Sequence, residues 1–255
     1  DELASPNACT DCHSNKSNAW AAQTSAQWFA SSKVTPKHYG QIINAARQRL
    51  PQVDHDLATL AMDKNAPAIV RATSISLLRN YAYSGINELL DKLYQDPDPL
   101  VRYAITDFLS VVNPAKRVNY LSDLLNDPVR AVRINTARIV LDTPARLLSQ
   151  EQQQAIQNVL DEYVAVLKFN LDRPEGRTNL ANFYGTLGNV ETAENYFKAA
   201  IVLGPALVQA YVNLADLYRS QQRDQEAEQI LQLGLKQAEN KAPLHHALGL
   251  TLVRQ

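Results

Sequence analysis

Apolar residues recur along most of the chain at the spacing of three and four residues that is typical of amphipathic helices. Val101, Ile105, Phe108 and Leu109 form one such set, which places all four on one face of a helix. Alanine and leucine dominate the composition, and the chain has only 8 glycines in 255 residues. This balance favours helix, so the pattern predicts an all-α protein.

Three segments between residues 65 and 142 align without gaps: NAPAIVRATSISLL, DPDPLVRYAITDFL and DPVRAVRINTARIV. Their period is 31 residues, and it repeats a Val-Arg pair at 70–71, 101–102 and 132–133. Each segment starts with a proline-bearing turn, where proline suits the first turn of a helix. The stretches INELLDKLYQD and VNYLSDLLND supply the second helices. The pattern resembles HEAT repeats, and we expect the repeated arginine to bind a neighbouring aspartate or helix-end carbonyl groups.

After Pro144 the period changes to 34 residues. The recurring positions are Leu180, Ala181 and Tyr184, then Leu214, Ala215 and Tyr218, then Leu248, Gly249 and Leu252. These positions resemble tetratricopeptide repeats (TPRs), in which small residues let paired helices approach closely and large ones fill the groove between them. The third repeat has only its first helix before Gln255. We therefore expect either a piece of a longer protein or packing against another copy.

Both cysteines of the chain lie in one motif, Cys9-Thr10-Asp11-Cys12-His13. CxxCH is the attachment motif for a c-type haem, because one helical turn brings both sulfurs and the imidazole to the same side of the porphyrin. The thiols would bond to the vinyl groups, and His13 would be the proximal iron ligand. A redox CxxC pair, half a zinc site and an inert pair are the alternatives. No βαβ pattern follows, and no further cysteine exists to complete a zinc site.

The motif followed by two repeat systems resembles the C-terminal portion of bacterial multihaem cytochromes c that carry such repeats. The stretch SPNACTDCHSNKSNAWAA looks like the last haem site of that family. The resemblance implies one covalent haem c here and a distal ligand upstream of Asp1. His38 is a distal candidate within the chain, and equally a surface or turn-capping histidine. Haem attachment to CxxCH takes place outside the bacterial cytoplasm, so we expect a periplasmic or extracellular protein.

Other candidate residues have ordinary structural explanations beside functional ones. Trp20 and Trp28 could line a haem edge or pack on the first repeat. His55 is expected at a helix start, and His245 and His246 in packing or solvent positions. A set of polar residues occupies first-helix positions of the TPRs that often meet a peptide, and any solvated groove also shows such polarity. That set is Asn179, Asn182, Asn213, Asp216 and Arg219.

The charge balance excludes some classes of function. The formal net charge is −1, from 25 Lys and Arg against 26 Asp and Glu, so we expect no nucleic-acid partner. No apolar run reaches the ~18 residues of a membrane span. No Ser/His/Asp set, phosphate-binding glycine loop or HExxH motif is present. Helix capping explains the aspartate pairs 54/56 and 96/98 without catalysis.

The predicted fold is a right-handed α-solenoid of HEAT-like and then TPR helix pairs, preceded by a short CxxCH segment. The predicted divisions are 1–35 for haem attachment, 36–145 for HEAT-like repeats and 146–255 for TPRs, with one long helix through 149–176 joining the two systems. The predicted function is electron transfer by a c-type cytochrome fragment, whose concave repeat face binds a redox or assembly partner. The alternative is an interaction scaffold with no haem. A haem enzyme would need an open iron position.

Overall fold

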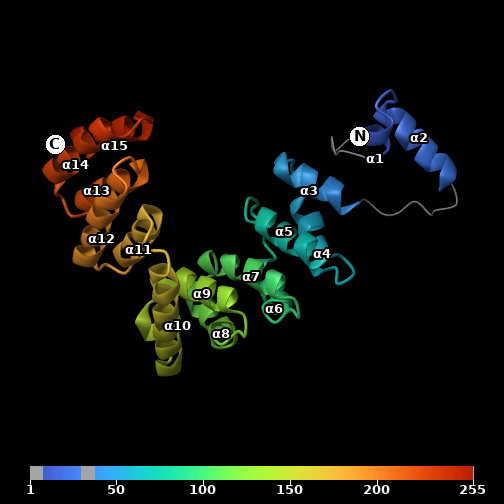
Figure 1. Cartoon of the computed structure of the whole chain (residues 1–255). Helices are drawn as coiled ribbons and strands as arrows, with labels where there is room; N and C mark the ends of the chain where they lie inside the picture. Colours follow the sequence, from blue (N-terminus) through green and yellow to red (C-terminus); the bar gives the residue numbers. More distant parts are fainter. Residues whose placement is uncertain (1–7, 30–37, 255) are drawn as a thin grey trace. The chain divides into compact units, whose positions relative to one another are not determined.

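Every regular element of the described residues, 8–29 and 38–254, is a helix in the computed structural model (Figure 1). The prediction of an all-α repeat protein is therefore confirmed. The chain divides into two compact units, one up to Gln153 and the other from Gln154 onward. Among the described residues, none of the helices has both the length and the apolar character that crossing a membrane requires.

The first unit consists of short helices. Their bounds are Ala8–Cys12 for α1, Asn18–Trp28 for α2, Tyr39–Arg47 for α3, Asp54–Met62 for α4, Ala68–Leu78 for α5, Ile86–Leu93 for α6, Pro99–Thr106 for α7, Pro114–Leu125 for α8 and Arg130–Ile139 for α9. Short 3-10 helices follow at Asp107–Ser110, Val140–Asp142 and Ala145–Leu147. Pro99 and Pro114 occupy first-turn positions, as expected for a residue that has no N–H to donate.

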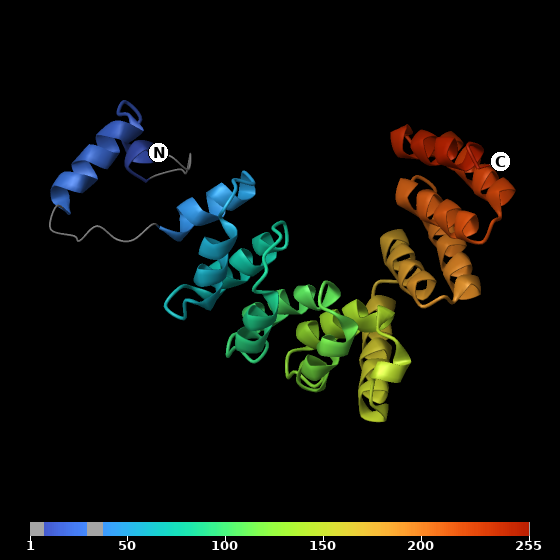
Figure 2. The same ribbon diagram turned by 180° about the vertical axis from the view of Figure 1, so that it is seen from behind.

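The helices from α3 to α9 stack in two layers. α3, α5, α7 and α9 contact one another in chain order, and α4 contacts α6 in the other layer. Figure 2 shows this succession from behind, in blue to green. The three aligned sequence segments become α5, α7 and α9, and the two intervening stretches become α6 and α8. The 31-residue period thus corresponds to one helix pair.

The repeated arginines bind aspartates or a backbone carbonyl, as predicted. The Arg71 guanidinium binds the Asp96 carboxylate at 2.5 Å, and Arg102 binds Asp127 at 2.6 Å in the next repeat. Arg133 donates to the backbone carbonyl of Asp127 at 2.6 Å. Burial alone would raise the pKa of Asp96, but hydrogen bonds from Arg71 and from the backbone N–H of Asp98 hold this pKa below its ordinary value. The arginines have a structural role in this unit.

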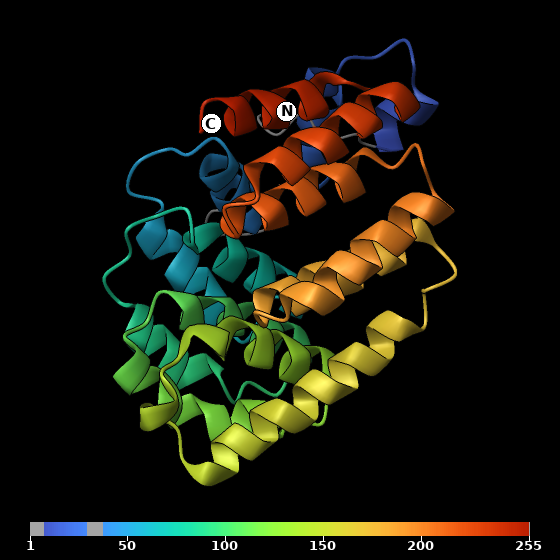
Figure 3. The same ribbon diagram turned by 90° about the vertical axis from the view of Figure 1, so that its left-hand side faces the viewer.

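The second unit contains longer helices. Their bounds are Gln150–Lys168 for α10, Pro174–Thr186 for α11, Val190–Leu203 for α12, Val208–Ser220 for α13, Asp224–Gln237 for α14 and Ala242–Leu252 for α15. α11 pairs with α12 and α13 with α14, while α15 packs on both α13 and α14. Figure 3 shows these helices side by side, in orange to red. One hydrophobic core runs through these helices. It combines small residues such as Ala181 with large ones such as Phe197, Tyr211 and Leu244.

The predicted long helix through 149–176 is wrong in its second part, because α10 ends at Lys168. Pro174 begins α11 instead, and a proline disfavours helical geometry in the residue before it. The first turn of α10 is tied to the first unit, since the Gln152 amide donates to the Val118 carbonyl at 2.8 Å. The two units therefore meet inside α10, eight residues after the predicted division at 145/146.

Candidate functional site

The first helices of the three predicted TPRs, α11, α13 and α15, form one face of the second unit. α13 contacts both α11 and α15, so corresponding turns of successive repeats lie side by side. Asn213 donates from its amide to the Asn182 side-chain oxygen at 2.8 Å, and Gln209 donates to Asn213. We call Asn182, Gln209 and Asn213 the amide row. The polar residues predicted at Asn182 and Asn213 are thus brought together, whereas Asp216 lies further along α13.

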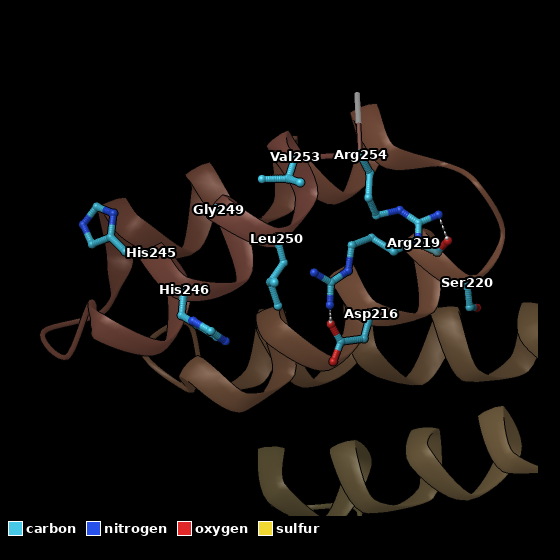
Figure 4. Close-up of a pocket in the computed structure, with 9 residues that line it drawn as sticks. All are labelled: Asp216, Arg219, Ser220, His245, His246, Gly249, Leu250, Val253 and Arg254. Carbon is cyan, nitrogen blue, oxygen red and sulfur yellow. Dashed lines mark hydrogen bonds and ion pairs between the residues drawn. The ribbon is translucent and has the colours of Figure 1, made fainter.

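A pocket of about 700 Å³ lies between α13 and α15 (Figure 4). Its lining contains three pairs of residues 34 positions apart: Asp216 with Leu250, Arg219 with Val253, and Ser220 with Arg254. His245, His246 and Gly249 complete it. The pocket therefore results from the packing of two successive first helices in the register of the repeat.

Two guanidinium groups lie at one end of this pocket. Arg219 is paired with Asp216, and its side chain is only 15% exposed. Arg254 reaches back to Asp224, with 3.2 Å between Nε and the carboxylate, and its side chain is 50% exposed. Arg254 also donates to the Arg219 backbone carbonyl at 3.3 Å. Of the two, Arg254 presents more of its charged group to solvent.

The remaining lining combines imidazoles with apolar side chains. His245 and His246 are both exposed on α15, and Figure 4 shows the His246 and Leu250 side chains on the side toward α13. Leu250 is 47% exposed and Val253 is 89% exposed. The polar set predicted from the sequence includes Asp216 and Arg219, but Leu250, Val253 and Arg254 had no predicted role. The 34-residue period itself was the missed signal, since it relates Ser220 to Arg254.

The CxxCH motif lies on α1 and just beyond it. Cys9 and Cys12 are free thiols, both exposed, and the His13 N–H donates to the Cys9 carbonyl at 2.8 Å, which continues the helical turn. The His13 ring lies edge-on to Trp20, with 5.2 Å between ring centroids. Ser17 caps α2 by accepting from the Trp20 N–H at 3.2 Å. Both sulfurs and the imidazole are therefore on one turn and accessible, which fits covalent haem attachment.

The segment 8–29 has very little core. Ala21 is its one buried residue, whereas Trp28 is 72% exposed and Phe29 is 64% exposed. Helices as short as α1 and α2 are marginal in water without packing. A bound group with a large apolar surface would supply what this segment lacks.

The other predicted histidine sites have structural partners or lie in solvent. His38 caps α3, with its Nδ1 accepting from the Gly40 N–H at 3.1 Å, and its ring lies 4.1 Å from that of Tyr39. The observed contacts of His38 therefore match the turn-capping alternative. His55 is exposed in the first turn of α4. Over 8–29 and 38–254, no three His, Cys, Asp or Glu side chains gather as a metal site would require.

Comparisons with known proteins support the repeats. The family described as HEAT repeats matches residues 56–142, and two tetratricopeptide repeat families match residues 174–203 and 210–243. The chain thus contains HEAT repeats and TPRs, and both support a repeat scaffold for protein interaction. These matches concern the repeats alone, so haem attachment at Cys9, Cys12 and His13 stays a prediction.

A solved structure of a thermophilic TPR protein from Thermus thermophilus is similar to the chain, with 18% identity and a TM-score of 0.40. The similarity covers 78% of this chain and 99% of that one. This likeness is too distant for any inference about function. No curated protein matches the chain significantly.

Proposed function

We propose that the chain is an interaction scaffold that binds an extended segment of a partner protein on the first-helix face of its TPRs. The observation that carries this proposal is the amide row beside the open pocket between α13 and α15. Side-chain amides both donate and accept hydrogen bonds, which is what an extended peptide backbone requires of the surface that holds it. Repeat solenoids offer such extended surfaces to partners.

The experiment is a selection of displayed random short peptides on the full chain, followed by fluorescence anisotropy of the enriched peptides. We expect Asn182→Ala/Asn213→Ala to weaken binding about tenfold. Gln232→Ala removes an exposed amide from α14, on the other layer, and should leave the affinity within about twofold. Failure to enrich any peptide, or equal binding by the amide-row variant, would contradict the proposal.

The coreless CxxCH segment favours a second candidate function, in which Cys9 and Cys12 hold one haem c covalently and His13 is its proximal ligand. The support is that both thiols are exposed on one helical turn, in a segment with a single buried residue. A bound haem would supply one-electron transfer. The repeats would then bring a protein redox partner close to it, in the periplasm or outside the cell. Trp20, edge-on to His13, restricts the orientation of the imidazole.

This second function is tested by pyridine haemochrome spectra and intact mass, after export of the full chain together with haem-attachment machinery. One covalent haem per chain is expected, and Cys9→Ala/Cys12→Ala should abolish it. His38→Ala should leave the haem spectrum unchanged, because His38 already caps α3 through Nδ1. Absence of covalent haem under these conditions would leave the scaffold function alone. A changed spectrum in the His38 variant would restore this residue as distal ligand.

A further inference from the structure

We propose that the pocket between α13 and α15 selects a partner segment that carries an acidic side chain next to an aliphatic one. This inference rests on the proposed scaffold function and adds the chemistry of the partner. Its starting point is the lining of the pocket, which joins hydrogen-bond donors to exposed apolar side chains (Figure 4).

Donor side chains outnumber carboxylates in the pocket. Arg219, Arg254, His245, His246 and Ser220 can all donate, whereas Asp216 is the one carboxylate of the lining. Arginine has only donors, and a neutral imidazole still has one N–H. Asp216 is already paired with Arg219. The groups that remain to meet a ligand therefore favour an acceptor, and a carboxylate most of all.

Arg254 is the residue best placed to receive this carboxylate. Its side chain is half exposed, and its Nε lies 3.2 Å from Asp224. A guanidinium has five N–H donors, so Arg254 can keep its contacts with Asp224 and the Arg219 carbonyl and still donate to a ligand. Arg219 is held more firmly, because it is 15% exposed and contacts both Asp216 and the Ala247 carbonyl. We therefore assign recognition of the acidic side chain to Arg254.

Leu250 and Val253 provide the apolar part of the surface. Leu250 lies in the last turn of α15 and is 47% exposed, and Val253, which is 89% exposed, caps the end of this helix directly before Arg254. Burying an aliphatic side chain against them would remove apolar surface from water on both partners. An aliphatic residue next to the acidic one would place each group against its counterpart. A basic segment would instead bring like charge to Arg254.

The peptide selection proposed for the scaffold function also tests this inference. Enriched peptides should combine Asp or Glu with Leu, Ile or Val. Arg254→Glu should weaken binding at least about tenfold, and replacing the acidic residue of the peptide by Lys should restore binding to that variant. Lys236→Glu makes the same charge change on the exposed surface of α14 and should bind within about twofold of the unaltered chain. Arg254→Gln tests loss of the charge without reversal.

The outcomes separate this inference from the function on which it rests. Enriched peptides that are neutral or basic, or that bind Arg254→Glu as well as the unaltered chain, would overturn the acidic-segment proposal and leave the scaffold function intact. No enrichment at all would overturn both. Circular dichroism of each variant, with a helical spectrum equal to that of the unaltered chain, shows that a loss of binding is not a loss of fold.

Discussion

The HEAT and TPR units solve the same problem, holding one helix pair against the next, by different means. In the HEAT unit, buried charges link the repeats: Arg71 is 5% exposed and Asp96 is 4% exposed. In the TPR unit the ion pair between repeats is less buried, since Arg223 and Glu194 have side chains 32% and 15% exposed, and close packing adds to it. Gly234 on α14 lies so near Leu244 on α15 that an added Cβ would come 3.0 Å from its Cδ2.

This difference means that the two units should respond to different substitutions. A buried ion pair is stable only while both partners remain, because a single buried charge has lost its water without a replacement. The stability of a close-packed interface depends instead on side-chain volume, so adding or deleting a methyl group lowers it.

Asp96→Ala should destabilise the HEAT unit by about 3–5 kcal/mol, because it leaves the Arg71 guanidinium buried without its carboxylate. Arg71→Met/Asp96→Leu should cost much less, since it removes both charges and fills the space with apolar atoms. Urea unfolding followed by circular dichroism measures both. If the double variant is as unstable as Asp96→Ala, the pair is not the source of the effect.

Gly234→Ala should destabilise the TPR unit by about 1–3 kcal/mol, because the new methyl group meets Tyr211 and Leu244 in a filled core. Gly249→Ala is the matched control on α15, where an added Cβ has nothing within 4 Å. It should stabilise the unit by about 0.5–1 kcal/mol through helix propensity. Thermal melts of the two variants should therefore shift in opposite directions, and shifts in the same direction would rule out the packing argument.

Glu194 should make the TPR unit sensitive to acid. A hydrogen bond from Arg223, supported by Lys198 and Tyr218, lowers the pKa of Glu194 to about 2, although burial opposes this. Because the folded pKa is depressed, its stabilisation is fully present above the ordinary value of 4.5 and is lost as the pH falls toward 2.

Glu194→Gln should accordingly lower the free energy of unfolding by about 1 kcal/mol at neutral pH. It should also reduce the fall in this free energy between pH 4.5 and 2. Unfolding curves recorded across this pH window provide the measurement. Glu191→Gln, at an exposed position of the same helix, should leave the pH profile as it is. A steep acid transition that persists in Glu194→Gln would assign it to other carboxylates.

Lys92→Ala should have the smallest effect, below about 0.5 kcal/mol. Lys92 and Glu88 pair at 2.6 Å on the surface of α6, and both side chains are more than half exposed. The pair therefore has the chemistry of Arg71 and Asp96 without their burial. Equal losses of urea stability in Lys92→Ala and Asp96→Ala would show that burial is not what distinguishes the HEAT linkage.

The sequence predicts much of this organisation because each repeat uses the same local solution. The 31-residue period located Arg71 and Arg102, and the expectation that they pair with aspartates is confirmed. The 34-residue period located Ala181 and Ala215, both fully buried. Where the same residue type recurs at the same position of each repeat, its packing can be predicted from the sequence.

What the sequence did not predict depends on contacts between helices. The pocket at Arg254 exists because α13 and α15 pack in register, and the 34-residue period relates its lining residues without showing that a pocket forms between them. The end of α10 at Lys168 was missed because its apolar spacing continues toward Pro174. The sequence allowed His38 to be either a haem ligand or a turn cap. The contact with the Gly40 N–H, which identifies it as a cap, is visible only in the structure.

Hydrogen exchange of the backbone amides, measured by mass spectrometry on the unaltered chain, Asp96→Ala and Gly234→Ala, tests most directly that the two units are held by different means. We expect Asp96→Ala to speed exchange in α4–α7 and to leave α11–α15 protected. We expect Gly234→Ala to do the reverse. Faster exchange through both units in either variant would contradict the account, because the repeats would then unfold as one body.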